Sequence, residues 1–259
     1  MRTSLLILLA LACVPIASAA GPWLGTASNG VAQYTANVHG KSTVVAAGSQ
    51  KLTLSGKWGL PRVTLNNDVG GLSADGRTLV LSRDDAVHNN GELSSETSFA
   101  VLGTKPLHVR TTVKIKGDFG FDALSPQGRI LYLIQHVSQE NLFQYRVRAY
   151  DLTKHKLLSQ VIADKRQRDW NMTGLPVGRA STPDGRWVYT FYSSANQNNY
   201  PFVHALDTVK RTAVCIGIPF DWTADQTAIE QATLSIKGGK LAIGGRFLLD
   251  RVTFKVTKT

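Results

Sequence analysis

A glycine-containing turn that recurs at a nearly constant spacing is the feature that most constrains this chain. Each of the four turns precedes a β-rich run, and they are Ser73–Arg77, Ser125–Arg129, Thr182–Arg186 and Ile236–Lys240. Their glycines, Gly76, Gly128, Gly185 and Gly239, are 52, 57 and 54 residues apart. A steady period near this length is typical of propellers and related arrays. Asp-Gly, or Gln-Gly after Pro, also supplies the tolerance of positive φ that a tight hairpin requires.

The residues after each turn predict further strands, so the repeating unit is a four-stranded antiparallel meander. In the second repeat Tyr145–Leu152 alternates between apolar and polar residues and Leu157–Ala163 runs back. Phe202–Asp207 and Thr212–Ile218 show the same pattern in the third repeat. The best helical candidate, around Ala224–Ala232, is short. The pattern therefore predicts an all-β fold.

The two ends of the chain bear on the number of units. Tyr34–Val38, Thr43–Ala47 and Lys51–Lys57 are predicted strands that precede the first turn, and the last repeat ends soon after Val252–Val256. An N-terminal strand that completes the last sheet would close a ring and remove exposed sheet edges. We therefore expect a small β-propeller of about five four-stranded blades, closed by an N-terminal strand, with four blades as the alternative.

The repeats resemble a known group of proteins. The S-P-x-G-R and T-P-D-G-R turns, each with a following strand and a later A-x-D turn, are similar to the WD40-like and TolB- and YVTN-type β-propeller blades of bacterial secreted proteins. The resemblance covers about residues 69–256 and is weaker in the fourth repeat, where Gly238-Gly239 replaces Asp-Gly. It implies a fold rather than an activity, because propellers serve as binding scaffolds and as enzymes.

The first 20 residues have the pattern of a secretory signal peptide. Met1-Arg2 is positively charged, Leu5–Ile16 is almost wholly apolar, and Ala17–Ala19 is a small-x-small cleavage motif. We therefore expect a signal peptide over residues 1–20, a propeller domain over residues 21–259, and export to the periplasm, cell envelope or outside. A membrane anchor is disfavoured because the apolar run is shorter than the roughly 20 residues that a bilayer requires.

The cysteines and the charge exclude several classes of protein. Cys13 loosely resembles a lipidation site, although the third residue before it is Ala where Leu is usual. After cleavage Cys215 would be the only cysteine, which excludes an intrachain disulfide framework and a Cys-based zinc site. The chain has 29 Lys+Arg against 18 Asp+Glu, without a run of five basic residues. This diffuse basicity favours anionic envelope polymers as partners rather than nucleic acid.

The long connections should carry any binding site, because irregular loops on a rigid scaffold are the usual carriers of function. In the predicted meander they lie together at one end of the sheets, and one of them is Asp164–Pro176. The candidate ligand-binding residues are Asn89, Asn90, Arg168, Trp170, Asn171, Asn198, Tyr200 and Trp222. Asn and Arg would hydrogen-bond a ligand, and Trp would stack on a sugar ring or a peptide side chain. The alternatives are solvated loop tips for the Asn clusters and packing plugs for Trp58, Trp170 and Trp222.

A search for catalytic motifs is negative. G-x-S-x-G, H-E-x-x-H, C-x-x-C and the nucleotide-binding glycine motifs are absent. We interpret Asp75, Asp184, Asp151 and Asp207 as turn residues and His204 as a partly buried, satisfied histidine. The sequence therefore predicts no catalytic residue, no metal site and no cofactor.

The function expected from these observations is that of a secreted, monomeric and noncatalytic β-propeller scaffold. It would bind a protein, peptide or anionic envelope polymer through its long-loop face, with no transmembrane segment after cleavage. One alternative is a propeller enzyme of the lactonase, hydrolase or quinoprotein type with a site at the channel mouth, which would leave no local motif. A purely structural envelope protein is the third hypothesis.

Overall fold

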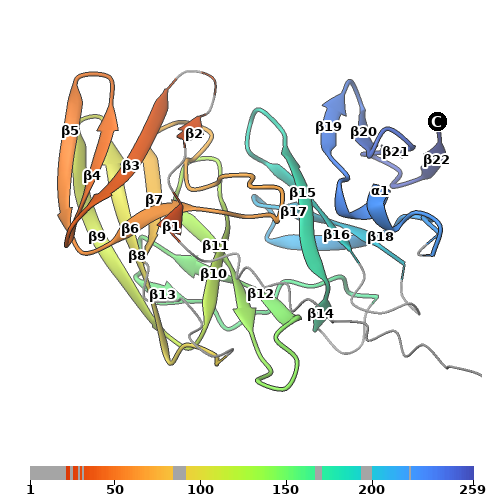
Figure 1. Cartoon of the computed structure of the whole chain (residues 1–259), viewed down its shortest axis with the longest axis horizontal. Helices are drawn as coiled ribbons and strands as arrows, with labels where there is room; N and C mark the ends of the chain where they lie inside the picture. Colours follow the sequence, from red (N-terminus) through yellow and green to blue (C-terminus); the bar gives the residue numbers. More distant parts are fainter. Residues whose placement is uncertain are drawn as a thin grey trace, which may run out of the picture.

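The computed structural model describes residues 22–23, 26–28, 30, 32–83, 92–166, 171–193, 200–221 and 223–259. The predicted signal peptide lies outside these residues. Strands β1 to β22 form five antiparallel sheets, and the short helix predicted near Ala224–Ala232 is α1 (Gln226–Glu230). Figure 1 shows the first sheet at the left of the long axis and the last sheet at the right. The prediction of an all-β fold with four-stranded antiparallel sheets is confirmed.

The first two sheets use strands from the first 116 residues of the chain. The first sheet contains β2 (Thr26–Ser28), β3 (Gln33–His39), β4 (Ser42–Ala47) and β5 (Gln50–Ser55). The second contains β1 (Pro22–Trp23), β6 (Trp58–Pro61), β7 (Thr78–Arg83), β8 (Glu96–Thr104) and β9 (Leu107–Lys116). The chain thus contributes β1 to the second sheet before it builds the first.

The remaining three sheets follow in chain order. The third contains β10 (Phe119–Leu124), β11 (Ile130–His136), β12 (Gln144–Asp151), β13 (Lys156–Leu157) and β14 (Met172–Thr173). The fourth contains β15 (Leu175–Ser181), β16 (Trp187–Ser193), β17 (Phe202–Asp207) and β18 (Thr212–Gly217). The fifth contains β19 (Leu234–Lys237), β20 (Lys240–Ile243), β21 (Phe247–Asp250) and β22 (Val256–Lys258).

The recurring turns have the chemistry that the sequence predicts. Asp75 and Asp184 each accept a hydrogen bond at 3.0 Å from the backbone N–H two residues later. The next residues, Gly76 and Gly185, have φ of 68° and 70°, the left-handed conformation that glycine adopts without steric cost. In the fourth repeat the left-handed residue is Gly238, with φ 58°, rather than the predicted Gly239.

Aspartates also end the third strands of the last three sheets, as predicted for Asp151 and Asp207. Oδ1 of Asp151 and Oδ1 of Asp207 each accept hydrogen bonds from the backbone N–H groups two and three residues later, at 2.9–3.0 Å. Asp250 makes the same contacts at 2.8 and 3.0 Å. Residues 251–253 form this turn, and the last strand, β22, begins at Val256.

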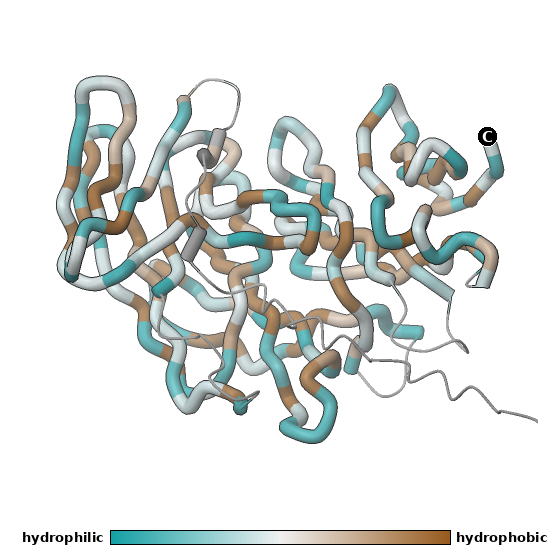
Figure 2. The backbone as a smooth tube through the Cα atoms, viewed as in Figure 1, coloured by the Kyte–Doolittle hydropathy of each residue, from teal (hydrophilic) through white to brown (hydrophobic). Residues whose placement is uncertain are grey.

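Hydrophobic cores lie between each sheet and the next. Four clusters of buried apolar side chains join the first sheet to the second, the second to the third, the third to the fourth, and the fourth to the fifth. Phe99 and Tyr189 are fully buried in two of them, and burying a side chain of this size contributes about 2–3 kcal/mol. Figure 2 shows the hydrophobic stretches inside the sheets and hydrophilic residues at hairpin tips. Trp58, 6% exposed, packs between the first two sheets and donates Nε1–H to the Ser55 carbonyl, as the packing-plug interpretation predicts.

Ring closure by an N-terminal strand is not found in the described residues. The fifth sheet takes its fourth strand, β22, from the C-terminus, whereas β1 and β2 join the second and first sheets. Within the described part of the chain, no hydrophobic cluster combines the first sheet with the fifth. The outer faces of these two sheets carry exposed polar residues such as Asn37, Thr53, Ser235 and Lys237. Polar outer faces of this kind cap the ends of an open array.

Candidate functional site

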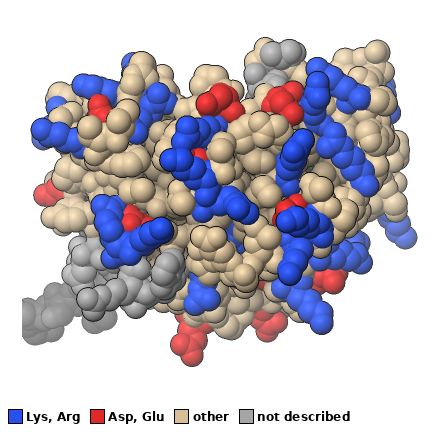
Figure 3. Space-filling model, turned by 180° about the vertical axis from the view of Figure 1, so that it is seen from behind, with Lys and Arg blue, Asp and Glu red and all other residues tan. Residues whose placement is uncertain are grey.

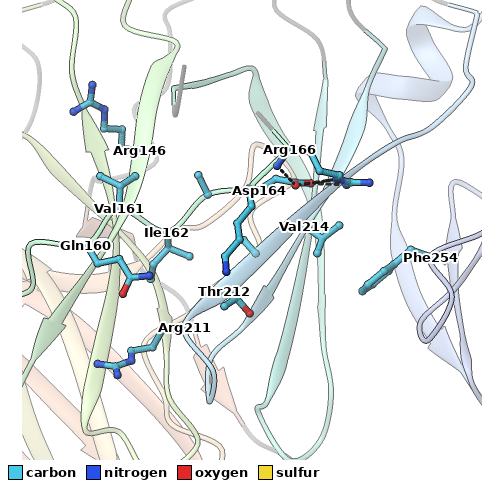
Figure 4. Close-up of a pocket in the computed structure, with 13 residues that line it drawn as sticks. Arg146, Gln160, Val161, Ile162, Asp164, Arg166, Arg211, Thr212, Val214 and Phe254 are labelled. Atoms are coloured by element: carbon cyan, nitrogen blue, oxygen red, sulfur yellow. Dashed lines mark hydrogen bonds and ion pairs between the residues drawn. The ribbon is translucent and has the colours of Figure 1, made fainter. Parts of the chain in front are cut away.

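A large cavity among the described residues lies at the rim, between the third and fourth sheets. Its volume is about 820 Å³. One wall is the segment that links β13 to β14, in which the Ile162 N–H donates to the Val147 carbonyl at 2.9 Å and holds the segment on β12. The other wall is the outer strand of the fourth sheet, β18, together with Arg211 from the β17–β18 turn. Figure 4 shows these walls facing each other, with Phe254 from the β21–β22 turn beside β18.

The lining combines an apolar floor with a cationic rim. The apolar side chains are Val161, Ile162, Ala163, Ala213, Val214 and Phe254. The charged ones are Arg146, Lys165, Arg166 and Arg211, with Asp164 as the one carboxylate, so the lining carries a net charge of +3. Such a surface attracts anions while it offers apolar area for burial.

Asp164 and Arg166 form a clasp across one end of the cavity. Arg166 Nε donates to Asp164 Oδ1 at 2.9 Å and Nη2 to Oδ2 at 2.5 Å. The pair then engages Cys215 of β18, whose N–H donates to Asp164 Oδ2 at 2.9 Å and whose carbonyl accepts from Arg166 Nη2 at 3.0 Å. We call these two side chains the Asp164–Arg166 clasp. It holds the linking segment against the fourth sheet.

The clasp carboxylate is ionised at neutral pH. Burial alone would raise the pKa of Asp164, but the hydrogen bonds from Arg166 and from the Cys215 N–H outweigh this effect and lower the pKa to about 2. Its contribution to stability is therefore complete above the ordinary carboxyl range and is lost only as the pH falls toward 2. The carboxylate of the clasp therefore stays ionised throughout the neutral pH range.

The other cations of the rim are available for a ligand. Lys165 and Arg211 are exposed, and among the described residues neither side chain makes a hydrogen bond or an ion pair. Arg146 is half-buried and donates Nε–H to Asn171 Oδ1 at 2.6 Å. Arg211 has φ 57°, a left-handed conformation that ends the β17–β18 turn and places the residue at the cavity.

Of the eight residues predicted to bind ligand, the structure places two. Asn171 lies beside the cavity through its contact with Arg146, and Tyr200 is a 68% exposed residue that does not line it. The other six lie outside the described residues, namely Asn89, Asn90, Arg168, Trp170, Asn198 and Trp222. The predicted long connection Asp164–Pro176 does contribute Asp164, Lys165 and Arg166.

The second half of the cavity lining was not predicted from the sequence. Arg211 and Phe254 come from short turns at the opposite end of the sheets from the long loops, so the cavity runs along the rim rather than across one face. The run predicted as a strand at Leu157–Ala163 is wrong beyond β13, and this irregular stretch forms one wall. Cys215 is half-buried on the edge strand β18, and its Sγ lies 3.7 Å from Met172 Sδ.

A second cavity, of about 290 Å³, lies where three of the recurring turns meet. The Asp75 N–H donates to the Pro126 carbonyl at 3.1 Å, and a Cβ on Gly185 would lie 2.6 Å from the Cβ of Ala74. Asp122 of β10 and Arg179 of β15 line this second cavity and form a buried ion pair at 2.9 Å. The pair joins the third sheet to the fourth on the side away from the rim.

His204 is more buried than the sequence predicts. It lies between Thr190 and Cys215 in the sheet, is 2% exposed, and its Nε2 has no hydrogen-bond partner among the described residues. Burial lowers the pKa of His204 from 6.5 to about 4, although Asp122 and Asp164 oppose the shift.

The buried imidazole predicts a pH-dependent stability. Because its pKa is lower in the folded chain, the unfolded chain takes up the proton first, and stability falls as the pH drops from 6.5 toward 4. His204→Leu should therefore lose less stability than the wild type over this window, as measured by urea unfolding at pH 7 and pH 5. The same slope in both proteins would contradict the prediction.

The described residues were also searched for metal-binding groups and for membrane-spanning helices. Across the described ranges, no group of three His, Cys, Asp or Glu side chains is arranged to hold a metal ion. None of the helices in those ranges is long and apolar enough to cross a membrane.

No protein-family model and no curated protein matches the sequence of this chain. Several solved structures are similar. A functionally unknown protein from Desulfotomaculum acetoxidans DSM 771 has a TM-score of 0.51 at 13% identity, over 91% of this chain and 68% of that one. TolB from Acinetobacter baumannii has a TM-score of 0.42 at 15% identity, over 84% and 48% of the two chains. Puromycin hydrolase has a TM-score of 0.49 at 15% identity, over 93% and 38%.

These likenesses concern the fold. At 13% identity the Desulfotomaculum protein shares with this chain an arrangement of sheets and no stated function. This chain spans less than half of the length of TolB or of puromycin hydrolase. The resemblance of the turns to WD40-like and YVTN-type repeats has no matching family model behind it, and the fold is propeller-like.

Proposed function

We propose that this chain is an exported, noncatalytic scaffold that binds an anionic segment of a partner protein in the rim cavity. The observation that carries the proposal is the combination of an apolar floor with a lining charge of +3. A volume of about 820 Å³ is within the range of about 300–1,000 Å³ that is usual for binding sites. Figure 3 shows Lys and Arg spread over the rear face with fewer acidic groups, and such a field steers anions toward the protein.

The floor favours a peptide over a polysaccharide. Val161, Val214 and Phe254 are half-buried and offer apolar surface that a hydrophilic sugar polymer would leave unburied. A peptide that alternates acidic and apolar side chains satisfies both parts of the lining. We therefore take an acidic peptide segment as the ligand, in keeping with the protein or peptide partner expected from the sequence.

A charge reversal at the rim tests the proposal. The probe is a short fluorescent peptide of alternating Glu and Val, and binding is measured by anisotropy at low salt. Lys165→Glu combined with Arg211→Glu changes the lining charge from +3 to −1, so the affinity should fall by at least about tenfold. Both side chains are exposed and make no hydrogen bond or ion pair among the described residues, so the fold should persist.

The controls separate this site from general basicity. Lys51→Glu reverses an exposed charge on the first sheet and should leave the affinity unchanged. A peptide with Lys in place of Glu should not bind, and added salt should weaken binding of the Glu peptide. The proposal is overturned if the rim variant binds like the wild type, or if vesicles of phosphatidylglycerol or an anionic polysaccharide bind through the same residues and the peptide does not.

A further inference from the structure

The edge of β18 forms part of the rim cavity. In the order of the fourth sheet, β18 is the outermost strand and pairs only with β17. Thr212, Ala213 and Val214 line the cavity. An edge strand presents main-chain N–H and C=O groups that a further strand can pair with, and proteins usually cover such edges.

The Asp164–Arg166 clasp covers one position of this edge. The Cys215 N–H donates to Asp164 Oδ2 at 2.9 Å, and the Cys215 carbonyl accepts from Arg166 Nη2 at 3.0 Å. The carboxylate and the guanidinium thus hydrogen-bond to the N–H and the carbonyl of Cys215, the two groups with which a neighbouring strand would pair. The contacts also show that the main chain of Cys215 is directed away from β17.

The same geometry directs the main-chain groups of Ala213 away from β17 and toward the cavity that it lines, while the residue as a whole is 6% exposed. In an antiparallel ladder, alternate residues of an edge strand direct both main-chain groups outward. Because Cys215 is such a residue, Ala213 is the next one along β18. Among the described residues, the main chain of Ala213 makes no hydrogen bond outside the sheet, and the cavity lies beside it.

We propose that the peptide adds to β18 as an extra antiparallel or parallel strand, pairing with the main chain of Ala213. This inference rests on the proposed function and specifies how the ligand is held. Main-chain hydrogen bonds would supply affinity, and the lining would supply specificity, as in other cases of strand addition. Because successive side chains of a strand point to opposite sides, alternating acidic and apolar residues can meet the cationic rim and the apolar floor.

The clasp limits the length of the added strand. With Cys215 already satisfied, the added strand ends before that position, so pairing is confined to the Thr212–Val214 part of β18. The same cover prevents two copies of this chain from pairing along all of β18. A short ligand is therefore favoured over edge-to-edge association.

Ala213→Pro tests the pairing directly. Proline removes the outward N–H of residue 213, which takes no part in the ladder with β17, so the edge strand should tolerate it. The affinity for the Glu-Val peptide should fall by at least about tenfold, the equivalent of one lost hydrogen bond of about 1.4 kcal/mol. Val214→Pro removes a ladder N–H instead and should lower the melting temperature, which checks the assigned orientation.

A second measurement does not depend on the variant folding. Two Glu-Val peptides are compared, one with N-methyl groups on the Glu amides and the other with N-methyl groups on the Val amides. The side chains are the same in both. One set of N-methyl groups removes the amides that pair with β18 and should abolish binding, whereas the peptide with the other set should bind like the parent. If both bind like the parent while Lys165→Glu with Arg211→Glu still weakens binding, strand addition is wrong and the proposed function stands. Failure of the parent peptide to bind would overturn both.

Discussion

Gly71→Ala is expected to lower the free energy of unfolding by about 3 kcal/mol. Gly71 has φ 102°, a conformation that residues with a side chain rarely adopt. A Cβ there would lie 2.5 Å from the Val80 carbonyl oxygen and 3.0 Å from Cδ of Pro61. The backbone cannot move away easily, because the Val80 N–H donates to the Gly71 carbonyl at 2.8 Å. The strain of the backbone conformation and the steric overlap of the added methyl group therefore both lower the free energy of unfolding.

Gly48→Ala is the matched control for this prediction. Gly48 also has a positive φ, 57°, but a Cβ there would meet nothing within 4 Å. Only the conformational cost remains, about 1 kcal/mol. Urea unfolding of both variants at pH 7 separates the two contributions. Equal losses in the two variants would show that close packing around Gly71 contributes nothing.

Arg179→Met should cost about 3 kcal/mol, because it leaves a buried carboxylate without its counter-charge. Arg179 Nη2 donates to the main-chain carbonyl of Asp122 at 2.7 Å and to its Oδ1 at 2.9 Å. The two side chains are only 11% and 4% exposed. Asp122 Oδ2 has no hydrogen-bond partner among the described residues, so the charge depends on Arg179. Methionine retains most of the apolar stem, so the loss comes from the ion pair and from the hydrogen bond to the Asp122 carbonyl.

A second substitution isolates the ion pair. Asp122→Asn removes the charge while keeping the shape, so the double variant Asp122→Asn with Arg179→Met should recover much of the stability that Arg179→Met loses. The four proteins form a double-mutant cycle, and a coupling of about 1–3 kcal/mol is expected from urea unfolding. If the double variant loses the sum of the two single losses, the pair does not hold the third and fourth sheets together as we infer.

Local chemistry explains why so much of the fold was predictable. The hydrogen bonds of Asp151 and Asp207 reach only two or three residues along the chain, and Gly76 and Gly185 need their conformation whatever packs around them. Strands such as Phe202–Asp207 and Thr78–Arg83 show alternating or apolar patterns that a single sheet accounts for. Patterns of this short range survive in the sequence.

The predictions that were wrong all concern residues whose structure depends on contacts with distant parts of the sequence. Leu157–Ala163 has the composition of a strand, yet after β13 the chain no longer pairs continuously with β12. It leads instead to Asp164, which accepts a hydrogen bond from the Cys215 N–H of the fourth sheet. His204 alternates like a half-exposed residue, but the third sheet packs over it. The expected ring closure also assumed that an N-terminal strand would join the last sheet, whereas β22 completes that sheet.

Some residues of the candidate site were likewise predictable from the sequence, and others were not. The predicted connection Asp164–Pro176 contributes the clasp, and Asn171 contacts Arg146 beside the cavity. Arg211 and Phe254 could not be associated with this connection from the sequence, because they lie in short turns of two other sheets. Only the packing of three sheets brings these residues to one cavity.

By itself, the sequence determined the strands, the turns and the division of the chain into similar antiparallel units, because those depend on neighbours within a few residues. The tertiary structure alone decided which sheets face each other and where the charges meet. Asp164 pairs with the main chain 51 residues away, and Arg179 with an aspartate 57 residues away. A hydrogen bond at that separation leaves no periodic trace, since its energy depends on a distance that only the folded sheets define.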